Sequence, residues 1–478
     1  MRTRIMLTIA FMLVLGSLAA EAEQIAGLSV HVEELGPGAV RVWLGDHASS
    51  TNVVGFATTE GIVVVDTFGI PDVDAELRTV IARELGRSDF RYLINTHEHD
   101  DHTGGNAAYD DCIIIGHELI ADGMAVFDQR HEQVLYWYRN NLPELESELQ
   151  SLDPASTEAA ALGERLIYER LFFERLQSSP EAVPPDLTFS DRMTLDLGDT
   201  TFELAYVGGM HTRSDITVFV PERGLLLTGD LMADVWLTDS PGCLASFAVR
   251  TGIPHDFPRY LANWDRLLDD PDSIALLLPG HWNGELSIEG AEARVEYVRA
   301  IWDGVNRAAE DGRGLEDVLA AYRLDSRFPD LVGSPGFSPQ IHFGSMVELW
   351  TDVTGEASAA RTLFELLESD ADETAIRDVV AARNAEPPRY FFFESELNGY
   401  GYVFFQRGDF DNAVRLFEIN AELFPSSWNV YDSLGEALAA RGDADRALAM
   451  YRRSLELNPE SETGRAFVET ASTTVSES

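Results

Sequence analysis

The feature that most restricts how this chain can fold is the run of residues 96–105, whose sequence is THEHDDHTGG. Three imidazoles and three carboxylates fall within six residues, directly after the apolar run YLIN at residues 92–95. Such an apolar run predicts a buried strand, and α/β sheets place their sites on the loops that leave strand ends. A mixture of imidazole and carboxylate donors favours zinc, manganese or iron over calcium. The run therefore predicts an α/β fold with a metal site at a strand end.

Other short apolar runs between residues 28 and 281 are also followed by histidine or aspartate. The runs at 62–65, 202–207, 225–227 and 274–278 are followed, in turn, by Asp66, by Gly209-Met210-His211-Thr212, by Thr228-Gly229-Asp230 and by Pro279-Gly280-His281. Together with residues 96–105, this ordered series resembles the signature of the metallo-β-lactamase superfamily. The resemblance covers residues 28–283.

The resemblance implies a fold class, α/β with an αββα sandwich, and two divalent metal ions at the sheet edges. One ion would be held by His97, His99 and His211, the other by Asp101, His102 and His281, and Asp230 would bridge both. Zn2+ is the favoured ion, with Mn2+ and Fe2+ as alternatives. A shared hydroxide would be the nucleophile, and Asp101 would be the catalytic group that orients it and passes a proton to the leaving group. Glu98 and Asp100 are expected to point away from the ions, and Arg213 and Asp215 to support His211 by pairing with each other.

The identity of residue 230 narrows the substrate class. Superfamily members that open β-lactams usually carry Cys or Ser at the bridging position, whereas the aspartate resembles the thioesterase, lactonase and phosphodiesterase branches. The chain has no lysine and few arginines near these motifs, which disfavours a phosphodiester. We therefore predict a hydrolase of a small carboxylic ester, thioester or lactone. Two alternatives stay open: a mononuclear iron oxygenase of sulfur compounds, and a non-catalytic assembly protein that merely holds metal.

The C-terminal part contains a repeat of 34 residues. The pairs that share this spacing are Gly401 and Gly435, Gly408 and Gly442, Ala413 and Ala447, Phe417 and Tyr451, and Pro425 and Pro459. Small residues at fixed points let two helices pack closely, and the proline ends the second helix. The period resembles that of tetratricopeptide repeats, which implies an all-α domain that binds a protein or peptide partner or associates with a second copy.

These patterns divide the chain into consecutive parts. We predict a signal peptide at 1–22, a catalytic domain at 23–300 with a helical insert at 118–177, a helical connecting region at 301–390, two repeats at 391–460 and a flexible tail at 461–478. In the first part, Arg2 and Arg4 precede an apolar stretch, and Ala20-Glu21-Ala22 forms a small-x-small cleavage site. This pattern predicts a periplasmic or secreted protein that has no membrane span after cleavage.

The composition excludes one class of partner. The chain has 35 basic and 81 acidic residues and a net charge of −46, so its surface repels phosphate backbones and nucleic acid is not a predicted partner. Export permits a disulfide between Cys112 and Cys243, but nothing in the sequence pairs these two residues.

Overall fold

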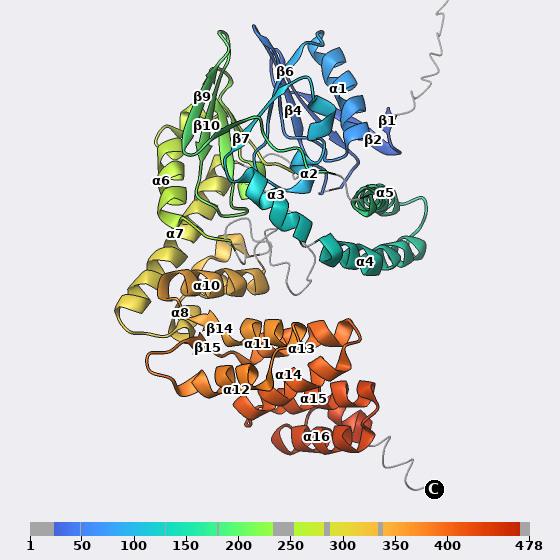
Figure 1. The fold of residues 1–478 in the computed structure, drawn as a ribbon, viewed down its shortest axis with the longest axis vertical. Coiled ribbons are helices and arrows are strands. Elements are labelled where there is room, and N and C mark those ends of the chain that lie inside the picture. Colours follow the sequence, from blue (N-terminus) through green and yellow to red (C-terminus); the bar gives the residue numbers. More distant parts are fainter. Residues whose placement is uncertain are drawn as a thin grey trace, which may run out of the picture.

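The structure is a computed structural model that describes residues 23–47, 49–129, 131–178, 181–232, 253–281, 287–332 and 338–468. The predicted signal peptide and Cys243 lie outside these residues. Among the described residues, no helix has the length and apolar character needed to cross a membrane. Figure 1 shows two sheets in the upper part of the molecule and a stack of helices in the lower part.

The first sheet has eight strands in chain order. They are β1 (Gln24–Ile25), β2 (Leu28–Glu34), β3 (Ala39–Leu44), β4 (Val53–Thr58), β5 (Gly61–Val65), β6 (Phe90–Ile94), β7 (Ile113–His117) and β8 (Leu187–Phe189). Neighbours are antiparallel from β1 to β5 and parallel from β5 to β8.

The second sheet has five strands in the order β13-β12-β11-β10-β9. They are β9 (Arg192–Asp196), β10 (Thr201–Tyr206), β11 (Ile216–Val220), β12 (Leu225–Leu227) and β13 (Leu276–Leu278). β12 and β13 run parallel, and the other neighbouring pairs run antiparallel.

Apolar side chains fill the space between the two sheets. Phe56 of the first sheet meets Phe202 of the second edge-on, with ring centroids 5.2 Å apart, inside one buried cluster. On the outer sides, α1 (Pro71–Leu85) covers the first sheet, and α6 (Phe257–Leu268) and α7 (Ile288–Glu310) cover the second. This order of layers confirms the predicted αββα sandwich.

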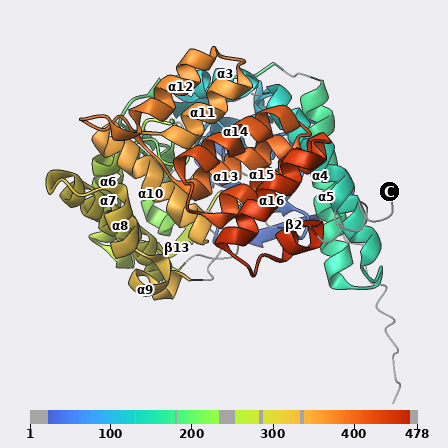
Figure 2. The ribbon, with the colours of Figure 1, turned by 90° about the horizontal axis from the view of Figure 1, so that it is seen from below.

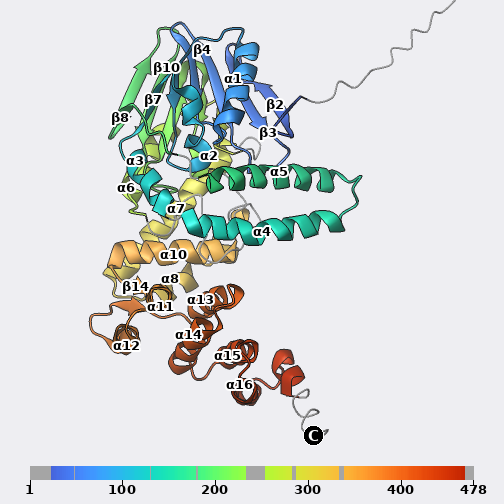
Figure 3. The ribbon, with the colours of Figure 1, turned by 45° about the vertical axis from the view of Figure 1, so that its right-hand side comes forward.

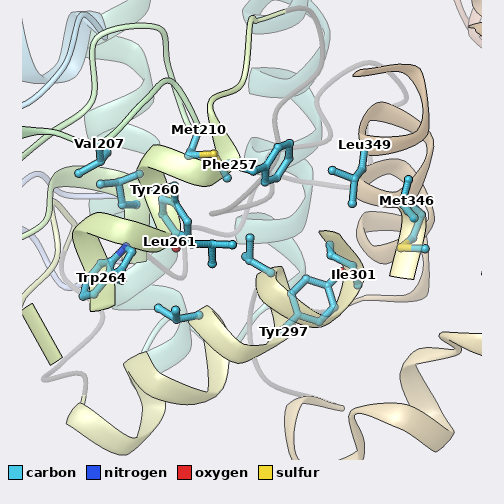
Figure 4. Packing of buried hydrophobic residues seen from close by; sticks show 14 of the residues in the cluster. Val207, Met210, Phe257, Tyr260, Leu261, Trp264, Tyr297, Ile301, Met346 and Leu349 are labelled. Atoms are coloured by element: carbon cyan, nitrogen blue, oxygen red, sulfur yellow. The ribbon is translucent and has the colours of Figure 1, made fainter. Parts of the chain in front are cut away.

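The layer that covers the second sheet continues past residue 300, where the sequence predicted a domain boundary. That position lies inside the single helix α7, which is followed by α8 (Leu315–Ala321), α9 (Leu324–Arg327) and α10 (Pro339–Thr354). Figure 4 shows Ile301 of α7 among buried side chains that include Leu261 of α6 and Leu349 of α10. The helices up to α10 therefore share one core with the second sheet, which extends the sandwich domain beyond the predicted boundary.

The predicted helical insert forms α3 (Ile120–Gln129), α4 (His131–Ser151) and α5 (Thr157–Gln177). α4 and α5 make a hairpin that projects sideways from the sandwich (Figure 3). Tyr168 and Phe172 of α5 contact the ring of Phe68, with centroids 5.5 and 6.0 Å away. On α4, the ring of Tyr136 lies 6.0 Å from the guanidinium of Arg407 in the C-terminal region. Phe68 lies three residues after the end of β5, so its contacts with Tyr168 and Phe172 place α5 beside the strand ends of the first sheet.

The C-terminal part is helical, as predicted, apart from the short pair β14 (Ala357–Ser358) and β15 (Tyr390–Phe391). Its helices are α11 (Ala359–Glu368), α12 (Glu373–Ala381), α13 (Glu394–Gln406), α14 (Phe410–Leu423), α15 (Trp428–Arg441) and α16 (Ala444–Leu457), which Figure 2 shows from below. α15 and α16 begin 34 residues after α13 and α14, respectively. Gly401 lies against Phe417, and Gly435 lies against Tyr451, so the repeated small and aromatic residues are helix contacts. Residues 462–468, predicted as part of a flexible tail, are helical.

The C-terminal helices join the rest of the molecule at α10. Phe393 meets Phe343 of α10 edge-on at 5.5 Å, and Glu348 of α10 forms an ion pair with Arg361 of α11. Glu396 of α13 lies in the same region: one of its oxygens accepts a hydrogen bond from Ser358 Oγ at 2.7 Å, and the other is buried without a hydrogen-bond partner. Burial, only partly offset by Ser358 and Arg361, raises the pKa of Glu396 to about 7.

We expect Glu396→Gln to remove a pH dependence of stability. The folded protein holds this proton more tightly than the unfolded chain, so stability should fall as the pH rises from the ordinary value of 4.5 through about 7. Between pH 5 and pH 8, the unfolding free energy of the wild type should drop relative to that of Glu396→Gln by roughly 2–3 kcal/mol. Denaturant unfolding followed by circular dichroism measures this difference. Parallel profiles for the two proteins would show that Glu396 titrates normally.

Candidate metal centre

Strand ends from both sheets converge at one end of the sandwich. In the first sheet, β5 is followed by Asp66, and β6 leads into residues 97–102 and the short helix α2 (Asp100–Thr103). In the second sheet, β10 is followed by His211, β12 by Asp230 and β13 by His281. α2 lies at the lower end of the sandwich in Figure 1, near α3 and α5. Side chains far apart in the sequence therefore meet at this end.

The first group of candidate ligands consists of His97, His99, His211 and Asp230. Nδ1 of His99 lies 3.1 Å from Nε2 of His97 and 3.1 Å from Nε2 of His211. Oδ2 of Asp230 lies 3.3 Å from the same His211 nitrogen. A neutral imidazole has one N–H and one lone pair, so nitrogens this close cannot all donate to one another. The four donor atoms all lie within 4.8 Å of one another, as the ligands of one cation do.

The second group consists of Asp101, His102 and His281. Nε2 of His102 and Nε2 of His281 lie 3.2 Å apart, although their positions differ by 179 in the sequence. Oδ2 of Asp101 lies 3.3 Å from Nε2 of His281. The structure thus brings together all seven ligand residues that the sequence predicted.

Asp230 contacts both groups. Besides its contact with His211, its Oδ2 lies 3.1 Å from Nε2 of His281, and its Oδ1 lies 3.4 Å from Nε2 of His102. Burial would raise the pKa of Asp230, but His281 and His102 lower it well below its ordinary value. Conversely, burial would lower the pKa of His281, but Asp230 and Asp101 raise it well above its usual range. A buried, ionised carboxylate in this position can be the shared ligand of two cations.

The ring nitrogens that face away from the second group are hydrogen-bonded. Nδ1 of His102 lies 3.0 Å from Oδ2 of Asp66, and Nδ1 of His281 lies 3.0 Å from the backbone oxygen of Ser49. Asp66 also accepts hydrogen bonds from the backbone nitrogen and hydroxyl of Thr96, at 2.8 and 2.7 Å. Partners of this kind fix the tautomer and orientation of a ligating imidazole. Asp66 therefore supports His102 from outside the two groups.

Two further carboxylates hold the loop that carries His211. Asp215 accepts hydrogen bonds from the backbone nitrogens of residues 210–212 at 2.7–3.0 Å. The sequence predicted that Asp215 would pair with Arg213, but its oxygens bind this backbone instead. The buried Glu98 accepts a hydrogen bond from the backbone nitrogen of Arg213 at 3.2 Å. As predicted, Glu98 points away from the ligand groups, and it ties the first motif to the His211 loop.

Two of the candidate ligands, His99 and Asp101, are partly exposed, and the others are buried. The side chains of His97 and Asp230 are 1% and 4% exposed, whereas that of Asp101 is 27% exposed. Asp100, also predicted to point away from the ligand groups, forms an ion pair with Arg175 of α5. Among the described residues, Asp101 is thus partly exposed beside the helical insert.

Sequence reasoning missed the residues that support the second group from other segments. The backbone nitrogen of Asn52 donates to the backbone oxygen of Gly280 at 2.7 Å, and Thr51 forms a bridge with His281. Arg175 lies on a helix of the insert that carries no motif. For residues 49–52, the one available signal in the sequence was their position directly before the apolar run that forms β4.

The sequence of residues 44–281 matches the family model described as the metallo-beta-lactamase superfamily. This part of the chain belongs to that superfamily. A search of curated proteins found no match. Similar solved structures include a metallo-beta-lactamase from Pontibacter korlensis, with 18% identity over 53% of this chain and 91% of that chain and a TM-score of 0.34. Another is the sec-alkylsulfatase Pisa1 from Pseudomonas sp., with 12% identity over 92% of this chain and 65% of that chain and a TM-score of 0.49. These values are too low to indicate a shared activity.

Two glycines let the strand ends of the metallo-β-lactamase domain approach each other. Gly229 has a φ of 51°, and a Cβ there would lie 2.7 Å from Thr96 Oγ1. A Cβ on Gly280 would lie 2.4 Å from Asp230 Oδ1 and 2.9 Å from Cε1 of His102. Since real Cβ contacts are longer, a side chain at Gly280 must displace the shared carboxylate.

We expect Gly280→Ala to lower metal content and activity together, by about tenfold or more in activity, because Asp230 would have to move. Gly163→Ala is the matched control, since a Cβ on this α5 residue would meet nothing within 4 Å. Elemental analysis after dialysis and thermal unfolding distinguish a damaged site from a damaged fold. Full metal content in a folded Gly280→Ala protein would contradict the geometry described here.

Proposed function

We propose that this chain is a dinuclear metal-dependent hydrolase that acts on a carboxylic ester, thioester or lactone. The observation that carries the proposal is the position of Asp230 in contact with imidazoles of both ligand groups. A single cation would need only one of these groups. Two complete groups that share a buried carboxylate fit a pair of divalent ions, with zinc favoured over manganese and iron because imidazoles dominate.

When bound, such ions would polarise the scissile oxygen and lower the pKa of a water to about 7, so that hydroxide is available at neutral pH. The chain's own residues supply the rest of the mechanism. Asp101 is the most exposed carboxylate of the two groups and can accept the proton of the attacking water and deliver it to the leaving group. His102 and His281 are held in fixed orientations by Asp66 and Ser49, so the site is preorganised.

The substrate class rests on residue 230 and on the charges beside the second group. The aspartate at this position resembles the thioesterase and lactonase branches of the superfamily more than the β-lactamases. Arg175 is paired with Asp100, and Arg165 lies 3.5 Å from Glu169, so these two cations are already neutralised. This arrangement favours a carbonyl substrate over a phosphodiester.

Asp230→Ala tests the proposal. The wild-type protein, loaded separately with zinc, manganese and iron, should bind two ions per chain. It should hydrolyse at least one member of a panel of esters, thioesters, lactones, β-lactams and a sulfate ester. Asp230→Ala should lose at least one ion and activity by about two orders of magnitude or more, because the remaining ion lacks its shared anion. Asp269→Ala, an exposed change at the end of α6, should leave both properties intact.

Other outcomes would replace the proposal. One iron per chain, with oxygen uptake on a persulfide, would favour the mononuclear sulfur oxygenase. A metal-loaded protein that cleaves no panel member would favour the non-catalytic assembly protein. Unchanged stoichiometry in Asp230→Ala would mean that this residue merely ends a strand.

We also propose that the chain is exported to the periplasm or secreted, on the evidence of residues 1–22. Mass spectrometry of the native protein should find Glu23 at the N-terminus, and an intact Met1 on a cytoplasmic form would contradict export. The 34-residue helical hairpins fit tetratricopeptide repeats that bind a protein or peptide or associate with a second copy.

A further inference from the structure

The two ligand groups differ in how the rest of the fold supports them. The first group is supported within the sandwich, because Glu98 and Asp215 accept hydrogen bonds from the backbone of the loop that carries His211. In the second group, Asp101 and His102 lie on α2, a helix of only four residues. Helices this short are not stable on their own, so the position of α2 depends on contacts with neighbouring elements.

Arg175 of α5 contacts both ends of α2. Its guanidinium pairs with the carboxylate of Asp100, the first residue of α2, and its Nη2 donates to the backbone oxygen of Gly104, the C-cap, at 3.3 Å. The side chain of Arg175 is only 8% exposed. A planar guanidinium presents several donors in a fixed geometry and can therefore bridge two acceptors that a lysine ammonium cannot span equally well.

The opposite part of α5 is also fixed to the sandwich. Glu164 accepts hydrogen bonds from the backbone nitrogen and hydroxyl of Ser29, at 3.0 and 2.5 Å, and from the backbone nitrogen of Asp46 at 2.6 Å. Between these contacts, Tyr168 and Phe172 pack on Phe68. α5 is thus held to the sandwich at Glu164, Tyr168 and Phe172, so Arg175 reaches α2 from a fixed support.

We propose that Arg175 is a positioning residue for the second metal, acting from the helical insert through α2. The inference rests on the proposed dinuclear function and deepens it, because it assigns the insert a role in holding one of the two ions. Arg175 bridges the two ends of the helix that carries Asp101 and His102. His99 of the first group is only the N-cap of α2, and that group has its own supports in Glu98 and Asp215, so loss of Arg175 should weaken the second ion more than the first.

The experiment uses the full-length protein with zinc as the probe. We expect the wild type to bind two ions and Arg175→Met to keep one tightly while the dissociation constant of the other rises about 10–100-fold, the usual effect of removing a residue that supports a ligand. Arg175→Lys should fall between them, because an ammonium can pair with Asp100 but loses the fork. Arg170→Met is the matched control, since Arg170 lies on the same helix and pairs with Glu146 at a site where both side chains are at least 40% exposed.

A second readout does not depend on metal. In the metal-free protein, hydrogen exchange of the amides of residues 101–104 should be faster in Arg175→Met than in the wild type, while the amides of residues 210–212 exchange equally in both. Asp100→Asn removes the same ion pair from the other side and should give the same two results. It replaces Arg175→Met in the experiment if that variant folds poorly.

The results separate the inference from the function on which it rests. A wild type that binds fewer than two zinc ions would overturn the proposed dinuclear hydrolase itself. A wild type with two ions, together with folded Arg175→Met and Asp100→Asn proteins that keep both ions at wild-type affinity, would overturn the positioning role alone. Equal weakening of both ions in these variants would also overturn it, because the effect would then not run through α2.

Discussion

The contact of one buried carboxylate with imidazoles from two separate groups is the interaction on which the rest of the site depends. Burying a charge is costly unless it is paired, and Asp230 is paired with residues that come from both sheets. The sandwich must therefore bring the ends of β6, β10, β12 and β13 to the same place before this carboxylate can be satisfied. Apolar packing between the sheets provides the rigidity, and close approach at two glycines provides the space.

The ligand residues could be predicted from the sequence because each follows an apolar run. Strands buried on both faces, such as β5 with the sequence GIVVV, produce such runs, and the residue that ends the run is then easy to find. β2, with the sequence LSVHVEE, and β9, with the sequence RMTLD, were not predicted, because half-exposed strands mix polar and apolar residues. The boundary predicted at residue 300 lies inside α7 for a related reason. The sequence of an amphipathic helix indicates that one face is buried, but not against which part of the protein that face packs.

Most of the supporting residues could not be predicted, although the sequence singled out Asp66 and Asp215. The backbone oxygen of Ser49 orients His281, and the carboxylate of Asp66 orients His102, but a backbone oxygen leaves no mark in a sequence. Arg175 lies 75 positions from Asp100, in a segment whose pattern predicts only that it is helical. Residue types therefore identify the atoms that could bind metal, whereas their orientation depends on long-range contacts that only the folded chain creates.

The separation of the ligands along the chain has a consequence for how the protein holds together. In the first group, His97 and His99 follow β6 of the first sheet and His211 follows β10 of the second, so an ion held by this group would tie the two sheets to each other. Closing a long loop removes conformational freedom from the unfolded chain, which is the usual account of how a disulfide stabilises an exported protein. Among the described residues, Cys112 is a buried free thiol. The metal centre would thus be a cross-link as well as a site of chemistry. Removal of the ions would remove the cross-link between the two sheets together with the activity.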